Sequence, residues 1–275
     1  MELAIAPGEI AMLVLALVAG GLVTGFLAGL LGIGGGGVLV PVLYETFTAL
    51  DVPEHIRMHM VLGTSFAVIV PTAWRSYRGH LAKGAVDTNV LRRLGPYAVG
   101  GVLVGIAFVS VASGAALKWV WIVCATFLGL KMALGRDDWR LGDELPKGWL
   151  SEAVAFSIGL VSALMSIGGG MFFVTFLTLY GTPLLTSVAT SSGFGPMIAV
   201  PGLLGYVWAG WGAVGAPPLS AGYVSLLGAA LIIPAGVFAA PWGVRAAHGI
   251  SKRKLELAFA AFLGVIALRL LVSML

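Results

Sequence analysis

Two runs of consecutive glycines interrupt long apolar stretches of this sequence. The first run occupies residues 34–37 and the second residues 168–170, and each follows an isoleucine. Another glycine precedes each run by nine residues, at Gly25 and Gly159. Because glycine has no Cβ, such a run breaks a helix, lets other backbones approach closely and leaves peptide N–H groups free to meet a ligand. The repetition predicts a duplicated unit with its working centre at the two breaks.

The composition indicates an integral membrane protein. Of the 275 residues, 59% are hydrophobic and 10% are charged, whereas ordinary soluble domains have about 25% charged residues. The apolar residues form continuous runs of about 18 or more, the length of helix that crosses a hydrocarbon core. They do not alternate with polar residues as in membrane β-strands. The expected fold class is therefore all-α and polytopic.

Apolar runs and their breakers predict eight hydrophobic segments, four in each half of the chain. They span residues 9–49, 59–74, 91–113, 117–135, 150–182, 185–209, 219–243 and 254–274. The halves align at an offset of 134 residues between the glycine runs and of 126 between Thr64 and Thr190. We interpret the chain as a first repeat over 1–135, a charged cytoplasmic linker over 136–149 and a second repeat over 150–275.

The distribution of lysine and arginine favours repeats of inverted orientation. Of the 16 basic residues, 13 lie in or beside three loops, near residues 75–93, 131–147 and 245–254, and such residues collect on the cytoplasmic side. Eight simple crossings would instead leave 10 inside and 6 outside. The first segment, 41 residues long, would be about 60 Å as one helix, twice the hydrocarbon thickness. If each glycine run turns its segment back, the repeats are inverted and both chain ends face outward.

The glycine breaks are the first candidate for substrate binding. In a re-entrant arrangement, the two tips enter from opposite faces and meet near the midplane. The short helices that follow, beginning near Val38 and Met171, would point their positive ends at an anion. Glycines at every fourth position, as from Gly21 to Gly29, allow tight helix packing instead, and the consecutive runs could serve the same purpose. Packing needs only one glycine per turn, so binding is the favoured interpretation.

Hydroxyl side chains at matching places in the two repeats are the second candidate. They can donate hydrogen bonds to the oxygens of an anion, although bonding to the helix's own backbone is the common alternative in membrane helices. The predicted substrate-binding residues are Gly34, Gly35, Gly36, Gly37, Thr64, Ser65, Gly168, Gly169, Gly170, Thr190, Ser191 and Ser192.

Three residues toward the membrane surface are candidates for a mouth or for coupling. His59 could titrate during proton coupling, with a simple interfacial location as the alternative. Arg75 and Arg78 could gather anions at the cytoplasmic mouth, with the positive-inside bias as the alternative. Arg269, near the C-terminus, is expected to snorkel toward the surface.

Several classes of function lack their residues. The sequence has no basic face for nucleic acid, no His-Glu-x-x-His, no P-loop lysine signature and no metal-ligand cluster. Its single cysteine, Cys124, builds no disulfide framework. The stretch Gly63-Thr64-Ser65-Phe66 superficially resembles an intramembrane serine nucleophile, but the glycine expected after the serine is missing. We expect neither an enzyme nor a cofactor or metal.

With these motifs in place, the sequence resembles the TauE/SafE family of membrane transporters, also called the sulfite exporter family. The resemblance is carried by residues 25–41 and 159–170, by the Thr-Ser motifs at 63–65 and 189–191, and by residues 219–224 and 240–243. It covers most of the chain. Two positions depart from the family pattern: His80 stands where asparagine is expected in the arginine-glycine loop, and Met171 follows only three glycines.

The resemblance implies a secondary transporter, an exporter, of a small sulfur-containing or organic anion such as sulfite or a sulfonate. A passive anion channel is the alternative, and a non-transporting scaffold or membrane enzyme is a third interpretation. The expected location is the bacterial inner membrane, with several passes. The expected partners are the anionic substrate, the lipid bilayer, a coupling ion (H+ or Na+) and further copies of the chain in a homo-oligomer.

Overall fold

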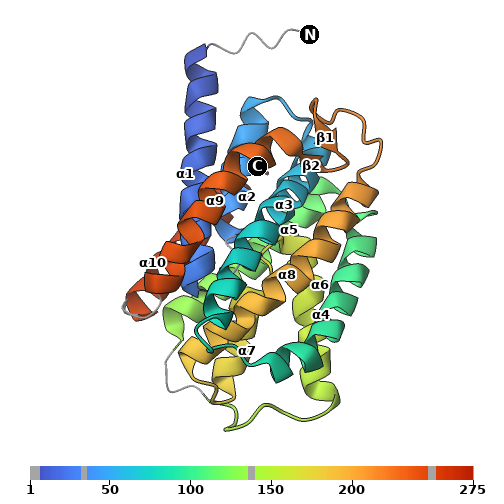
Figure 1. Ribbon diagram of the computed structural model, residues 1–275. Helices are drawn as coiled ribbons and strands as arrows, with labels where there is room; N and C mark the ends of the chain where they lie inside the picture. Colours follow the sequence, from blue (N-terminus) through green and yellow to red (C-terminus); the bar gives the residue numbers. More distant parts are fainter. Residues whose placement is uncertain (1–6, 32–35, 136–139, 247–251, 275) are drawn as a thin grey trace.

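The computed structural model describes residues 7–31, 36–135, 140–246 and 252–274, which form a bundle of ten helices with one short hairpin (Figure 1). Six of these helices, α1, α3, α4, α5, α8 and α9, are long and apolar enough to cross a membrane. The all-α polytopic fold is confirmed at this level. The elements are α1 (Pro7–Leu31), α2 (Gly36–Ala49), α3 (Glu54–Leu81), α4 (Thr88–Val109), α5 (Gly114–Leu134), α6 (Trp149–Met165), α7 (Gly170–Leu179), α8 (Leu184–Ala209), β1 (Ser220–Ala221), β2 (Val224–Ser225), α9 (Leu226–Ala246) and α10 (Lys252–Val272).

Both glycine runs interrupt a helical segment, as predicted. The first segment divides into α1, which ends at Leu31, and α2, which begins at Gly36. The second divides into α6, which ends at Met165, and α7, which begins at Gly170. Gly34 and Gly35 lie outside the described residues. Figure 1 shows α2 running back toward the end of the bundle where α1 begins, so the segment 9–49 is not one straight span.

Two predicted segments have wrong bounds. The segment 59–74 is part of a longer helix, α3, which begins directly after Pro53. The polar last turns of α3 remain helical, and their Ser76 and His80 side chains bond to backbone oxygens of α1. The segment 219–243 does not begin as a helix. Its first residues form the antiparallel hairpin β1–β2, whose turn contains Gly222 at a φ of 56°. A left-handed glycine suits such a turn, and α9 begins only after it.

Glycines bring two pairs of helices into close contact. α1 packs along α9, and a Cβ on Gly25 would overlap the carbonyl oxygen of Gly236. α4 packs along α6, and a Cβ on Gly159 would overlap the carbonyl oxygen of Ala98. Gly29 meets the backbone of α9 in the same way. The predicted packing role of the evenly spaced glycines in α1 is therefore confirmed, because small residues let membrane helices approach closely.

The antiparallel pair α3 and α8 forms the centre of the bundle. A Cβ on Gly202 would lie 2.9 Å from the ring of Phe66, and a Cβ on Gly195 would lie 2.8 Å from the Cβ of Ala73. The short helices that follow the glycine runs pack against this pair, α2 on α3 and α7 on α8, while α5 pairs with α10. The start of α2 and the second glycine break therefore lie beside α3 and α8.

Candidate functional site at the glycine breaks

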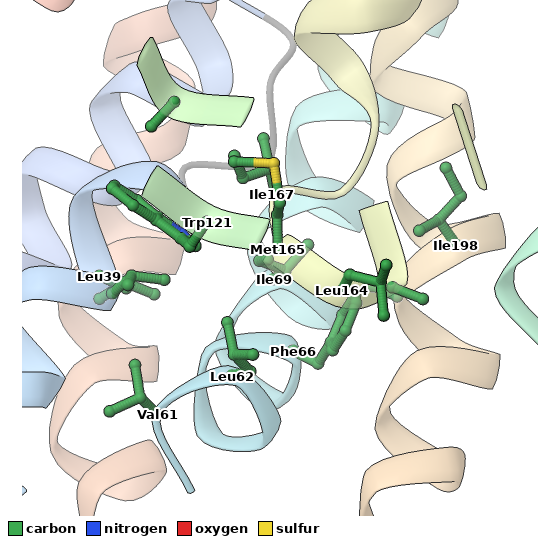
Figure 2. Close-up of a cluster of buried hydrophobic side chains, with 14 of the residues drawn as sticks. Leu39, Val61, Leu62, Phe66, Ile69, Trp121, Leu164, Met165, Ile167 and Ile198 are labelled. Carbon is green, nitrogen blue, oxygen red and sulfur yellow. The ribbon is translucent and has the colours of Figure 1, made fainter. Parts of the chain in front are cut away.

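The start of α2 meets the loop that precedes the second glycine run. A Cβ on Gly36 would overlap the carbonyl oxygen of Ser166 and would lie 2.9 Å from Cδ1 of Ile69 on α3. Figure 2 shows Ile69 close to Met165 and Ile167, the residues on either side of Ser166. Gly36 and Ser166 are 130 positions apart in the sequence but are in contact in the interior. The contact leaves no room for a side chain at position 36.

The second break has a left-handed backbone. Ser166 has a φ of 51°, and Gly168 and Gly169 both have a φ of 72°. L-residues with a side chain rarely adopt this region, so glycine is required at two of these positions and Ser166 is strained. Gly169 is the N-cap of α7 and provides no side-chain cap. The first N–H groups of α7 therefore have no side-chain acceptor at the cap, and the helix dipole favours negative charge there.

The predicted threonines hold backbone N–H groups of helix caps. Oγ1 of Thr190 accepts the N–H of Asp87, and Oγ1 of Thr64 accepts the N–H of Ser225, each at 2.9 Å. Asp87 is the N-cap of α4, and Ser225 directly precedes α9. Both threonines are buried, and their oxygens satisfy backbone donors at the starts of two helices. Each hydroxyl keeps its own hydrogen, which it can still donate.

The three predicted serines differ in what they bond. Oγ of Ser65 faces the carbonyl oxygen of Ser166 at 3.5 Å, and Oγ of Ser192 donates to the carbonyl oxygen of Ala189 within its own helix at 2.6 Å. Oγ of Ser191 is buried and has no partner. Ser191 lies one turn before Phe194, whose ring stacks on that of Phe173 in α7 with centroids 3.6 Å apart. Because position 169 meets Ile198 and Phe173 meets Phe194, α7 and α8 run antiparallel, and Ser191 lies level with the second half of α7, away from its first turn.

Two residues near the second break also carry unpaired buried polar atoms and were not among the predicted site residues. They are Ser166, with its Oγ, and Trp121, with its indole Nε1. In Figure 2 the ring of Trp121 lies between Leu39 and the segment that carries Met165 and Ile167. Ser166 lies two residues before the second glycine run, so its position was a usable signal. Nothing in the apolar sequence around Trp121 distinguished it from a lipid-facing tryptophan.

The site that results is lined by neutral hydrogen-bond donors. A buried donor without an acceptor costs about 1–3 kcal/mol, and buried tryptophan N–H groups usually find a partner. Ser166, Ser191 and Trp121 are each at most 1% exposed, so solvent does not supply that partner. An oxyanion beside the second break would accept hydrogen bonds from the hydroxyl of Ser166, the indole of Trp121 and the first N–H groups of α7, whereas Ser191 lies further along α8.

His59, Arg75 and Arg78 lie elsewhere. Nε2 of His59 is 3.2 Å from the carbonyl oxygen of Ala112, and its ring packs on Tyr223 with centroids 4.7 Å apart. His59 thus ties α3 to the connection between α4 and α5 and to the hairpin. Arg75 and Arg78 are exposed near the last turns of α3. The structure does not bring any of the three to the glycine breaks.

Ion pairs gather at the hairpin end of the bundle. Lys118 is 2% exposed and pairs with Glu54, which also pairs with Arg57 at 2.6 Å. Arg269, which was expected to snorkel toward the surface, bonds through its Nε and Nη2 to the two carboxylate oxygens of Glu45 at 2.8 and 3.2 Å. This fork ties the end of α10 to α2, because arginine and carboxylate geometries match.

Residues 17–270 match the protein-family model described as "Sulfite exporter TauE/SafE". The chain belongs to the TauE/SafE family. A "Probable membrane transporter protein" of Haemophilus influenzae is 31% identical over 250 residues, covering 91% of this chain and 95% of that protein. Another "Probable membrane transporter protein", from Methanocaldococcus jannaschii, is 25% identical and covers 96% of this chain and 97% of its own length. No solved structure gives a significant match.

This TauE/SafE chain is a multi-pass membrane transporter and not an enzyme. The family assignment that its motifs suggested is therefore confirmed. Transport implies a small substrate and a membrane.

Proposed function

We propose that this TauE/SafE transporter exports a small sulfur-containing or organic anion, such as sulfite or a sulfonate, by alternating access. The observation that carries the proposal is the pair of buried, unpaired donors beside the second glycine break, the hydroxyl of Ser166 and the indole N–H of Trp121. Donors without acceptors favour a ligand that is rich in acceptor oxygens, and the start of α7 adds a positive helix end. Oxyanions of sulfur have these properties, and the family description names sulfite.

The proposed binding residues are the predicted glycines and hydroxyls, with two additions. Thr64 and Thr190 can each donate their remaining hydrogen, and Ser191 is wholly available. Ser166 and Trp121 extend the set because their polar atoms are unpaired. The described glycines of this set, Gly36, Gly37, Gly168, Gly169 and Gly170, would contribute backbone N–H groups, and Gly34 and Gly35 belong to the same proposal.

We further propose that the chain consists of two inverted repeats, residues 1–135 and 150–275, joined by the linker 136–149. Corresponding helices make corresponding contacts: α1 pairs with α9 as α6 pairs with α4, and α2 packs on α3 as α7 packs on α8. α3 and α5 pair with their own counterparts, α8 and α10. A two-fold axis in the membrane plane makes a helix antiparallel to its counterpart, as α3 is to α8.

Single residues support the same proposal. Gly25 and Gly159 correspond at the offset of 134, and their contacts, Gly236 and Ala98, are 138 positions apart. The N–H donors to Thr64 and Thr190 are Ser225 and Asp87, which are also 138 positions apart. Equivalent residues therefore make equivalent contacts with the opposite half. This arrangement suits a transporter in which one half rocks against the other around a shared central site.

The experiment that tests the transport proposal is flux into proteoliposomes that contain the purified protein. Radiolabelled sulfite and a sulfonate should show saturable uptake, and unlabelled anion on the opposite side should accelerate exchange. A passive channel would carry the same anions without this acceleration. Absence of flux for every such anion, with the protein folded, would rule the proposal out. Imposed H+ and Na+ gradients in the same vesicles identify the coupling ion, and cross-linking in the membrane identifies a homo-oligomer.

A further inference from the structure

A basic hollow lies between the last turns of α3 and α9. Its volume is about 400 Å³. Four of the residues that line it are basic and exposed, and they come from two helices and the turn after α3. These four are Arg75, Arg78, Lys83 and Arg245.

The positive charge of this basic hollow is not neutralised by the part of the chain that the structure describes. No carboxylate lines the hollow, and no described Asp or Glu forms an ion pair with any of the four basic residues. Within the described residues, their side chains make a single hydrogen bond, from Nζ of Lys83 to the carbonyl oxygen of Val244 at 3.4 Å. Like charges this close repel one another, so an anion in the hollow would relieve the repulsion.

The basic hollow is closed on its inner side. A Cβ on Gly79 would lie 3.3 Å from the side chain of Val244, so α3 and α9 touch at the floor. Behind this contact, Oγ of Ser76 donates to the carbonyl oxygen of Ala28 at 3.1 Å, and Nε2 of His80 lies 3.1 Å from the carbonyl oxygen of Gly29. The hollow therefore faces outward from the bundle and does not lead inward between these helices.

Exposed aromatic side chains flank the basic hollow. Trp74 is next to Arg75 and is 52% exposed, and Trp242, one turn before Arg245, is 50% exposed. The ring of Trp242 packs edge-to-face on exposed Phe238, with centroids 4.9 Å apart. In a membrane protein, such tryptophans lie at the boundary between hydrocarbon and headgroups. The four cations are thus at headgroup level, beside an apolar surface that lipid tails can cover.

We propose that the basic hollow binds the phosphate headgroup of an anionic phospholipid. The three guanidinium groups can bond phosphate oxygens in pairs, Lys83 adds a point charge, and the acyl chains lie along Trp74, Phe238 and Trp242. The site is separate from the central donors, so it regulates or stabilises the transporter without touching the transported anion. A lipid that bridges α3 and α9 joins the two halves of the chain at one membrane surface.

Native mass spectrometry and thermal unfolding of detergent-purified protein test this site with phosphatidylglycerol, using phosphatidylcholine as the neutral lipid. Phosphatidylglycerol should remain bound and raise the unfolding temperature, and phosphatidylcholine should do neither. The double variant Arg75→Gln/Arg245→Gln should weaken phosphatidylglycerol binding at least tenfold. Arg92→Gln, which removes an exposed arginine of α4 outside the hollow, should leave it unchanged.

The single variant Arg78→Gln gives a second measurement if the double variant does not fold, and it should weaken lipid binding several-fold. Equal binding in wild type and both variants would overturn the proposal. So would protection by free phosphate or methanesulfonate at the same affinity, because the hollow would then take a soluble anion. Flux assays on the same samples separate this result from the transport proposal, since loss of lipid binding with sulfite flux retained concerns only the hollow.

Discussion

At the scale of single residues, the interior of this transporter contains hydrogen-bond donors that the protein leaves unpaired. Trp121 is fully buried, and neither its indole N–H nor the hydroxyls of Ser166 and Ser191 have a partner. Each such group costs stability in a low-dielectric interior. Buried donors that have no partner in the protein are expected where a ligand supplies the acceptors. Substitutions of these residues are therefore the most direct tests of the proposed site.

Replacing Trp121 by phenylalanine removes the unpaired donor and keeps an aromatic ring. We expect anion flux to fall about tenfold, because the variant loses one hydrogen bond to the substrate. A tenfold change corresponds to about 1.4 kcal/mol of binding free energy. The unfolding temperature of the substrate-free protein should fall less than it would if the indole N–H had a hydrogen-bond partner within the protein. Trp119→Phe, on the same helix but 50% exposed, is the control and should keep wild-type flux. Wild-type flux in Trp121→Phe would remove this residue from the site.

The serine pair in α8 permits a comparison within one turn. Ser191→Ala should raise the KM for the anion about tenfold, because its hydroxyl is free to donate to the substrate. Ser192→Ala should change it little, because that hydroxyl is already bonded to the carbonyl oxygen of Ala189. Initial rates of proteoliposome uptake at a series of anion concentrations measure both. Identical KM values for the two variants would contradict the assignment of Ser191.

At the scale of elements, the two predicted threonines connect helices of the two proposed halves. Thr64 on α3 holds the start of α9, and Thr190 on α8 holds the start of α4. A residue that looks like a ligand in the sequence is here an acceptor for a helix cap. The central helices α3 and α8, which pack beside the glycine breaks, therefore also fix the first residues of the outer helices α9 and α4.

Thr64→Val should lower the free energy of unfolding by about 1–3 kcal/mol, because the backbone N–H of Ser225 loses its acceptor. Thr190→Val should have a similar effect through Asp87. Thr64→Ser and Thr190→Ser keep the oxygen and should stay within about 1 kcal/mol of wild type. Unfolding in mixed micelles with increasing SDS provides the measurement. A loss of transport in the valine variants with full stability would show that the hydroxyls act on substrate rather than on the caps.

At the scale of the whole molecule, the two proposed halves predict the side of each loop. Inverted repeats place the α4–α5 and α8–β1 connections on the same side, whereas eight simple crossings place them on opposite sides. Val111 and Val214, at 81% and 85% exposure, mark these two connections. In a Cys124→Ala background, Val111→Cys and Val214→Cys should react with a membrane-impermeant maleimide from the same face. Asn89→Cys and Lys147→Cys should react only from the other face.

Labelling of Val214→Cys together with Asn89→Cys, and apart from Val111→Cys, would contradict inversion and restore the simple count. The cysteine at 124 is removed because it is partly exposed and would give a background signal. Flux measured on each cysteine variant confirms that the labelled protein is folded.

The features that were predictable from the sequence are those that depend on consecutive residues. Hydropathy identified the membrane helices, because a helix that spans the hydrocarbon core needs about 20 consecutive, mostly apolar residues. The glycine runs marked both breaks, since the lack of a Cβ acts on the backbone where it stands. The hairpin at Ser220 was missed, because an apolar run alone does not distinguish a short strand from a helix start.

Only the tertiary structure decided which polar groups have partners. Thr64 and its donor Ser225, like Lys83 and Val244, are 161 positions apart in the sequence. In a dry interior, a hydroxyl or an indole N–H acts as cap or as open donor according to what the fold places within about 3 Å of it. Thr190 thus became the acceptor for a helix cap, Ser191 and Trp121 stayed unpaired, and three arginines and a lysine from segments far apart in the sequence came to share one hollow.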